Sequence, residues 1–189
     1  PILAVARDLN LQQVATASAR AGSVAAMVVN PPLRANPLVE ISVVPGALPE
    51  VAPSLLALSR KLGLNAVLAG ANGSGTGLIA GRLRGAMRQA GEQLLIAGAA
   101  PSEVDTALRN WGFRLGPFEA EDRLGLAAAR DDYARTSSDR DSQLIGTPLA
   151  DALLAAGRTG RASGAGWYDY TTPGAGAQQD PGVTAILQD

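Results

Sequence analysis

The chain has 189 residues, of which 47% are apolar, and its net charge is −1. This length suits one ordinary domain or two small ones, and the apolar fraction is sufficient for a buried core. The near-neutral charge and the aromatic content of 4% argue against nucleic-acid binding, and no apolar run approaches the length of a membrane span.

The chain contains no histidine and no cysteine. These absences exclude Ser-His and Cys-His nucleophiles, a histidine general base, thiolate chemistry and disulfide bonds. No acidic cluster has the spacing of a metal-binding loop, so we expect no metal site. The single lysine, Lys61, lies near a predicted helix C-terminus, where a cation favours the helix dipole, so we interpret it as structural. No secretory signal is visible, which predicts a cytoplasmic protein.

Strand-like and helix-like segments alternate in the first third of the chain. Short apolar runs predict strands at residues 1–5, 23–29, 38–44 and 65–71. Apolar residues at helical spacing predict helices at residues 8–20, capped by Asp8, and 48–62, ended by Gly63. Alternation of this kind indicates a mostly parallel sheet with helices on its faces.

After residue 75 the pattern is helical. We expect helices at residues 78–97, from Pro101 onward, at 117–135 with a break at Gly125, at 148–156, and from Asp180-Pro181 onward. The helix from Pro101 has Ser102 as its expected N-cap and Asp105 three residues later, a spacing close to a capping box. A polar loop is expected at residues 136–147. The predicted organisation is therefore α/β followed by all-α, with an α/β domain over residues 1–75 and a helical domain over residues 76–189.

Residues 75–80, Gly-Thr-Gly-Leu-Ile-Ala, fit the G-x-G-x-x-A fingerprint of dinucleotide-binding proteins. The fingerprint also requires a second strand that ends in an acidic residue about 20 residues further on. Here the helix continues to Ala97, and Glu92 lies within it. This pattern favours a glycine-rich connection between the two halves over a nucleotide site.

Three segments of the helical half carry a resemblance to a known family. They are residues 92–108, residues 112–126 with the run Gly-Phe-Arg-Leu-Gly-Pro-Phe-Glu, and residues 157–170 with the ending Trp-Tyr-Asp-Tyr. In order and spacing they resemble the C-terminal helical domain of L-3-hydroxyacyl-CoA dehydrogenases. The Trp-Tyr-x-Tyr ending looks most like the multifunctional β-oxidation enzymes, which fuse this module to an enoyl-CoA hydratase.

The aromatic residues of these segments look structural. We expect them to hold the helical domain together, with one group anchoring the helices and the other clamping the tail onto the same core. The expected helix anchors are Trp111, Phe113 and Phe118, and the expected clamp residues are Trp167, Tyr168 and Tyr170.

The first half resembles the same family more weakly. Residues 24–31 resemble a strand that ends in Gly-x-His-aromatic-aromatic-Asn-Pro, and residues 38–41 resemble the strand after it. The resemblance implies a partial Rossmann-like NAD-binding domain whose first half is not part of this chain. It also implies a His that takes the substrate's hydroxyl proton and a Glu that orients that His. Aligned on Asn30-Pro31, the His position is Met27 and the Glu position is Glu40.

A thioether does not accept a proton near neutral pH, so Met27 cannot act as this base. Of the family's polar substrate-binding groups only Asn30 matches, because Gly81 replaces an Asn and Ala6-Arg7-Asp8 replaces an Asn-Thr-Ser-Ser turn. Glu40 would then be a buried carboxylate without a partner, unless water or Arg34 reaches it. We therefore expect Glu40 to be the remnant of a His-Glu pair, and we expect no hydride transfer and no bound NAD.

Four functional readings remain open. The chain is a structural part of a 3-hydroxyacyl-CoA dehydrogenase or multifunctional β-oxidation protein, packed against another module or a second copy through its helical domain. Alternatively, it binds acyl-CoA without turning it over, with Arg7, Arg34 and Arg82 as candidate partners for the CoA phosphates. A third reading is one half of an active dehydrogenase. The fourth is a helical interaction or dimerisation domain that does not bind acyl-CoA.

Overall fold

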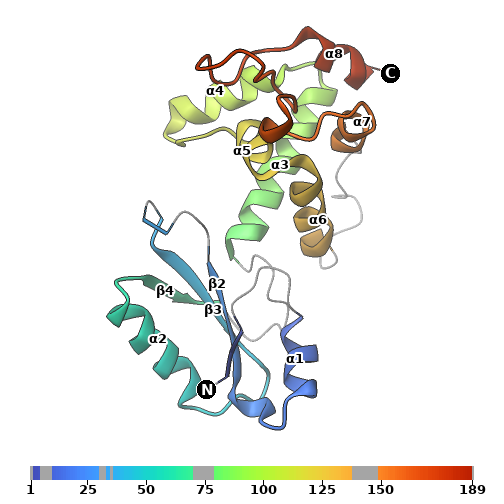
Figure 1. Cartoon of the computed structure of the whole chain (residues 1–189). Helices are drawn as coiled ribbons and strands as arrows, with labels where there is room; N and C mark the ends of the chain where they lie inside the picture. Colours follow the sequence, from blue (N-terminus) through green and yellow to red (C-terminus); the bar gives the residue numbers. More distant parts are fainter. Residues whose placement is uncertain are drawn as a thin grey trace. The chain divides into compact units, whose positions relative to one another are not determined.

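The computed structural model describes residues 2–4, 10–29, 33–34, 36–69, 79–137 and 149–188 of the chain. The chain divides into two compact units, Pro1–Arg82 and Leu83–Asp189 (Figure 1). None of the helices that the structure describes is both long enough and apolar enough to cross a bilayer.

A four-stranded sheet forms the centre of the first unit, with the strand order β1-β2-β3-β4. The strands are β1 (Ile2–Ala4), β2 (Val24–Val29), β3 (Leu38–Val43) and β4 (Asn65–Leu68). The pairs β1–β2 and β3–β4 are parallel, which confirms the mostly parallel sheet, whereas β2–β3 is antiparallel. Only residues 30–37 join β2 to β3, and a parallel crossover needs a dozen residues or more, so the chain turns back as a hairpin.

Two helices cover opposite faces of this sheet (Figure 1). They are α1 (Leu11–Ala17) and α2 (Val51–Lys61). The apolar cluster on the α1 side consists of Leu11, Ala15, Val24, Ala26 and Val44. The cluster on the α2 side consists of Ala25, Ile41, Val51 and Leu55. Neighbouring residues of β2 thus belong to different clusters, as the alternation of side chains along a strand requires.

The start of α1 differs from the prediction. The N-cap is Asn10, whose side-chain oxygen accepts a hydrogen bond from the Gln13 amide at 3.1 Å. The prediction of Asp8 as the cap was wrong, because Asn and Asp are equally good caps and the local pattern did not distinguish them. The end of α2 follows the prediction, with Gly63 in the left-handed region at φ 69° just beyond it.

The second unit is helical and has one apolar core. Its helices are α3 (Ile79–Ile96), whose first turn belongs to the first unit, α4 (Pro101–Trp111), α5 (Pro117–Leu124), α6 (Leu126–Ser137), α7 (Leu149–Ala155) and α8 (Pro181–Gln188). The core consists of Leu95, Val104, Phe118, Leu126, Ala150, Leu153, Trp167, Tyr168 and Val183. The predicted break at Gly125 is confirmed, since this glycine separates α5 from α6 with a φ of 93°. The predicted polar loop lies largely outside the described residues.

The N-cap of α4 is Ala100 and not Ser102. Pro101 occupies the first helical position, where a missing amide proton costs nothing. The Glu103 carboxylate accepts a hydrogen bond from the Ala100 amide at 2.7 Å. The acid predicted to complete a capping box, Asp105, is instead fully buried and faces the interior of the unit.

The predicted aromatic anchors separate into two kinds. Phe118 is fully buried and packs on Trp167, with ring centroids 4.6 Å apart. Trp111 is 79% exposed and stacks on Phe113 at 5.6 Å, so its prediction as an anchor was wrong. Trp111 is the last residue of α4, and the helix places its side chain away from the core.

The packing of α2 predicts a contrast between two of its leucines. Leu55→Ala should reduce the free energy of unfolding by about 2–5 kcal/mol, because it removes a buried side chain from the cluster with Ala25 and Ile41. Leu58→Ala is the matched control, because Leu58 is an exposed leucine on the same helix. Urea denaturation followed by circular dichroism measures both, and equal losses in the two variants would contradict this packing.

Candidate functional site

Glu40 lies on β3 and is 1% exposed. Its carboxylate accepts hydrogen bonds from the first two amides of α3, Ile79 N–H to Oε2 at 2.7 Å and Ala80 N–H to Oε1 at 3.0 Å. These amides have no partner within the helix, and the positive end of the helix dipole favours an anion there. The expectation of a carboxylate without a partner was therefore wrong, since the start of α3 supplies the partner. Arg34, the other expected partner, is exposed.

The strand register also revises the predicted pairing of Met27 with Glu40. Val28 lies directly opposite Glu40, whereas Met27 lies opposite Ile41. Because side chains alternate along a strand, Met27 is on the α2 side of the sheet and Glu40 is on the α1 side. A shift of one residue along a strand moves a side chain to the other face, so the register decides which residue of β2 lies beside Glu40. The residue beside Glu40 is therefore Val28, which also has no group that accepts a proton.

The remaining predicted site residues are not brought together by the described structure. Asn30, Arg7 and residues 75–78 of the glycine-rich segment lie outside the described residues. Arg82 lies in the first turn of α3. Among the described side chains, no group of three or more acids could hold a metal ion.

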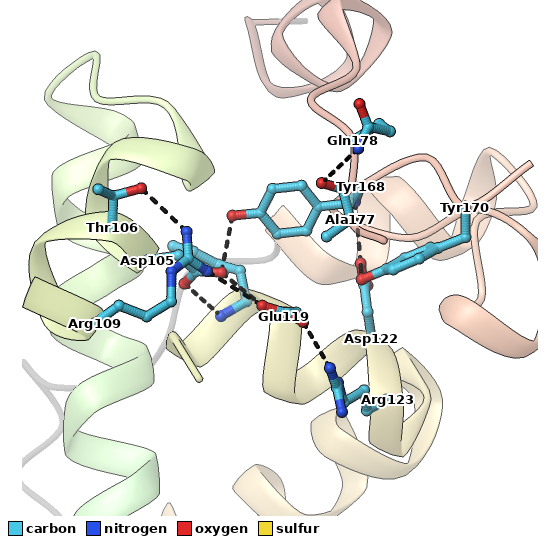
Figure 2. Close-up of polar contacts among 11 residues, drawn as sticks. Asp105, Thr106, Arg109, Glu119, Asp122, Arg123, Tyr168, Tyr170, Ala177 and Gln178 are labelled. Carbon is cyan, nitrogen blue, oxygen red and sulfur yellow. Dashed lines mark hydrogen bonds and ion pairs between the residues drawn. The ribbon is translucent and has the colours of Figure 1, made fainter. Parts of the chain in front are cut away.

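The second unit contains buried acids that the sequence did not indicate, and the first is Asp105 on α4. Its carboxylate accepts hydrogen bonds from the amides of Phe118 at 3.0 Å and Glu119 at 2.9 Å, at the start of α5. It also accepts the Tyr168 hydroxyl at 2.8 Å (Figure 2). Burial raises the pKa of Asp105, against the effect of these hydrogen bonds. Burial and the neighbouring Asp105 carboxylate also raise the pKa of Tyr168, which keeps the phenol protonated as a donor.

Asp122 on α5 fixes the aromatic tail, residues 167–170, by hydrogen bonds. Its carboxylate accepts the amides of Trp167 at 2.8 Å and Tyr168 at 3.0 Å, and also the Tyr170 hydroxyl at 3.0 Å (Figure 2). The predicted clamp of the tail onto the core is thus confirmed. Asp122 lies four residues after the buried Phe118 and therefore shares its helix face, which is the one sequence signal that could have revealed it.

A third buried acid, Glu121, belongs to an ion cluster with Arg88 and Glu92 of α3. Arg88 Nη2 lies 3.2 Å from Glu92 Oε1, and Arg88 Nε lies 3.1 Å from Glu121 Oε1. Glu121 also accepts the indole N–H of Trp167 at 3.0 Å. Burial raises the pKa of Glu121 to about 7, although the Arg88 charge opposes this shift. Burial likewise raises the pKa of Asp122 to about 6.

These contacts define the chemistry that the described side chains can perform. The carboxylates of Glu40, Asp105 and Asp122 each accept at least two backbone amides, and their oxygens are engaged within the protein. Such carboxylates cap helices and fix turns, because a buried ion with charge-assisted hydrogen bonds is stable only while those donors stay in place.

Solved structures contain a similar succession of a sheet unit and a helical unit. The structure of FadB2 from M. tuberculosis superposes with a TM-score of 0.80 at 21% identity, covering 89% of this chain and 60% of that one. The structure of 3-hydroxybutyryl-CoA dehydrogenase from Escherichia coli superposes with a TM-score of 0.78 at 24% identity, covering 88% of this chain and 36% of that one. These likenesses confirm the predicted fold class.

Sequence comparison identifies the family. Residues 77–170 match the family model described as 3-hydroxyacyl-CoA dehydrogenase, C-terminal domain. The peroxisomal bifunctional enzyme of Danio rerio is 28% identical over 192 residues, which cover 95% of this chain and 26% of that protein. The fatty acid oxidation complex subunit alpha of Shewanella putrefaciens is 30% identical over 167 residues, which cover 86% of this chain and 23% of that protein. The chain belongs to the 3-hydroxyacyl-CoA dehydrogenase family, as predicted, and spans about a quarter of the length of these curated relatives.

The raised pKa of Glu121 predicts that stability falls as pH rises. The folded state binds the Glu121 proton up to about pH 7, whereas the unfolded chain releases it near 4.5, so the free energy of unfolding decreases across this window by up to about 3 kcal/mol. The raised pKa of Asp122 also makes the free energy of unfolding decrease as pH rises. Thermal unfolding followed by the fluorescence of the buried Trp167 should give a higher Tm at pH 5 than at pH 8.

Glu121→Gln should flatten this pH dependence, because the amide does not titrate. Asp151→Asn is the control, since Asp151 is an exposed acid of the same unit. An unchanged slope in Glu121→Gln would show that this carboxyl is already ionised in the folded protein at pH 5.

The Asp122 clamp predicts that residue 166 must be glycine. A Cβ at Gly166 would collide with the carboxylate of Asp122. Gly166→Ala should therefore lower the free energy of unfolding by about 3 kcal/mol. Gly22→Ala is the control, because its Cβ would meet its nearest neighbour at an ordinary 3.4 Å. Urea denaturation compares the two, and equal stabilities would contradict the close approach of the tail to α5.

Proposed function

We propose that the chain is part of a multifunctional fatty-acid β-oxidation protein, in which it is a 3-hydroxyacyl-CoA dehydrogenase module without hydride-transfer activity. The observation that supports this is that, within the part of the chain that the structure describes, the β2 residue opposite Glu40 cannot accept a proton. Val28 occupies that position on β2, and the chain contains no histidine. The relatives named as a bifunctional enzyme and as a fatty acid oxidation complex subunit support the wider assignment.

The chemistry of the family explains why this position matters. Oxidation of a 3-hydroxyacyl-CoA to the 3-keto compound transfers the C3 hydrogen to NAD as hydride and releases the hydroxyl proton to a base. Val28 and Met27 do not accept a proton. The carboxylate of Glu40 is already bonded to Ile79 and Ala80. In our proposal, a substrate bound next to this sheet therefore finds no imidazole or other base on β2 opposite Glu40.

We propose that residues 1–75 are the remnant of an NAD-binding domain and that residues 76–189 are the C-terminal helical domain. NAD is the cofactor of the family, and in our proposal this chain does not bind it. Two amides at the start of α3, which follows the glycine-rich segment, already donate to Glu40. The predicted Asn30 contact with an acyl-CoA substrate stays a prediction, and so does the cytoplasmic location, since relatives named as peroxisomal also match.

A second candidate function is favoured by the surface of the second unit. Trp111 is 79% exposed and stacks on Phe113, and large exposed aromatic side chains are enriched at protein interfaces. In this reading the chain is a helical interaction or dimerisation domain that does not bind acyl-CoA. Its partner is another module of the same polypeptide or a second copy. The remaining reading, one half of an active dehydrogenase, is weakened because a proton acceptor is missing from both Met27 and Val28.

Calorimetric titration of the chain with NAD, a 3-hydroxyacyl-CoA and acetoacetyl-CoA distinguishes these readings. An inactive module that keeps its substrate site should give saturable heat with the two acyl-CoA compounds and none with NAD. The absence of binding heat with all three ligands would favour the interaction domain. Binding of NAD together with NADH formation from the 3-hydroxyacyl-CoA would contradict the proposed loss of hydride transfer.

A further inference from the structure

We infer that the open edge of β4 pairs with β4 of a second copy of this chain, so that two sheet units form one continuous sheet. β4 is the last strand of the described sheet, and β3 is its only partner there (Figure 1). The inference concerns the first unit alone and does not depend on the proposed loss of hydride transfer.

The backbone of β4 directs alternate residues toward its open edge. The amides of Asn65 and Ala69 donate to carbonyl oxygens on the β3 side, each at 2.8 Å. In a parallel pair such residues alternate with residues whose N–H and C=O groups point away from the partner strand. In β4 these are Ala66 and Leu68, and no further strand of the described sheet lies on that side. A row of groups of this kind is matched by another extended strand.

The side chains of β4 do not protect this edge. The strand reads Asn-Ala-Val-Leu, with no charged residue and no proline, which are the residues that natural edge strands use to prevent pairing. Val67 is 41% exposed and Leu68 is 49% exposed, and neighbouring residues of a strand face opposite sides of the sheet. Both faces of the edge therefore present apolar surface that a paired strand would cover.

The order of side chains makes β4 complementary to itself. In an antiparallel pair with a twofold axis at Val67, Leu68 lies opposite Ala66 of the second copy, and Ala66 lies opposite its Leu68. These residues exchange backbone hydrogen bonds, and each large side chain lies beside a small one. The two copies of Val67 meet on the axis as a pair of β-branched side chains. A twofold contact of this kind closes at two copies and leaves no open edge.

The charges of α2 also fit a second copy. α2 packs over β3 and β4, and neighbouring strands are about 4.8 Å apart, so the two copies of α2 lie about 10 Å from each other on one face, which is a helix packing distance. They run antiparallel. The exposed Glu50 at the start of one helix therefore lies toward the exposed Arg60 and Lys61 at the end of the other, and the helix dipoles are opposed.

Sedimentation equilibrium of the full chain tests the association. The contact is small, so dimers should form at protein concentrations of about 0.1–1 mM. Val67→Lys places two like charges across the axis and should weaken association at least about tenfold. Leu33→Lys is the matched control, because it adds the same charge at an exposed residue of the same unit outside β4, and it should leave association unchanged. Far-UV circular dichroism checks that both variants fold.

Amide hydrogen exchange of the unaltered chain locates the contact. Exchange at Ala66 and Leu68 should slow several-fold as the protein concentration rises through this range, because their N–H groups are bonded only in the dimer. The amides of Asn65 and Ala69 are the internal control, since they are bonded on the β3 side in each copy and should not respond to concentration.

Two results would overturn the inference. If the unaltered chain stays monomeric up to about 1 mM, β4 does not pair with a second copy, and its edge is left for a strand of another protein or module. If the chain dimerises while Val67→Lys has no effect and exchange at Ala66 and Leu68 is independent of concentration, the contact lies elsewhere, as it would if the exposed Trp111 and Phe113 formed it.

Discussion

Buried carboxylates that accept backbone amides from distant segments are the interaction on which both units depend. Glu40 accepts the first two amides of α3, Asp105 accepts two at the start of α5, and Asp122 accepts two from the aromatic tail. In each case the donors are amides without a partner in their own helix or turn, and the acceptor would be an isolated ion without them. The carboxylate therefore supplies an acceptor to the amides, and the amides stabilise the buried charge of the carboxylate. Loss of either partner leaves a buried charge or buried amides unsatisfied.

The helical unit combines these acids with its aromatic core. Trp167 packs on Phe118, donates its amide to Asp122 and donates its indole N–H to Glu121. The same residue is thus fixed by apolar packing and by two hydrogen bonds of different geometry. This double fixation explains why the Trp-Tyr-Asp-Tyr ending and the Gly-Pro-Phe start of α5 occur together in this unit. They are the two sides of one packed contact.

In the sheet unit the same kind of carboxylate lacks a chemical partner. A catalytic acid–base pair needs an imidazole next to its carboxylate, but here Val28 lies opposite Glu40. The start of α3 donates two amide hydrogen bonds to this acid. Loss of hydride transfer and retention of the fold are therefore compatible in our proposal, since Glu40 closes a helix whether or not a base lies beside it.

The sequence by itself determined the kind and order of the elements. Apolar runs marked β2 and β3, helical spacing marked α2 and α3, and Gly125 marked the break between α5 and α6, because these signals act between residues close together in the chain. The segments of the helical half also identified the family. The absence of histidine excluded an imidazole base, because no fold can supply a side chain that the chain lacks.

The tertiary structure alone decided which groups meet. It placed Val28 rather than Met27 beside Glu40, because a register shift of one residue turns a side chain to the other face and no local pattern fixes the register across a loop. It made Asp105 an acceptor for α5 rather than part of a capping box, and it left Trp111 exposed at the end of α4. It also gave Glu40 its partner 39 residues away. A carboxylate and the amides that satisfy it have no characteristic spacing in sequence, so only the folded chain shows that they meet.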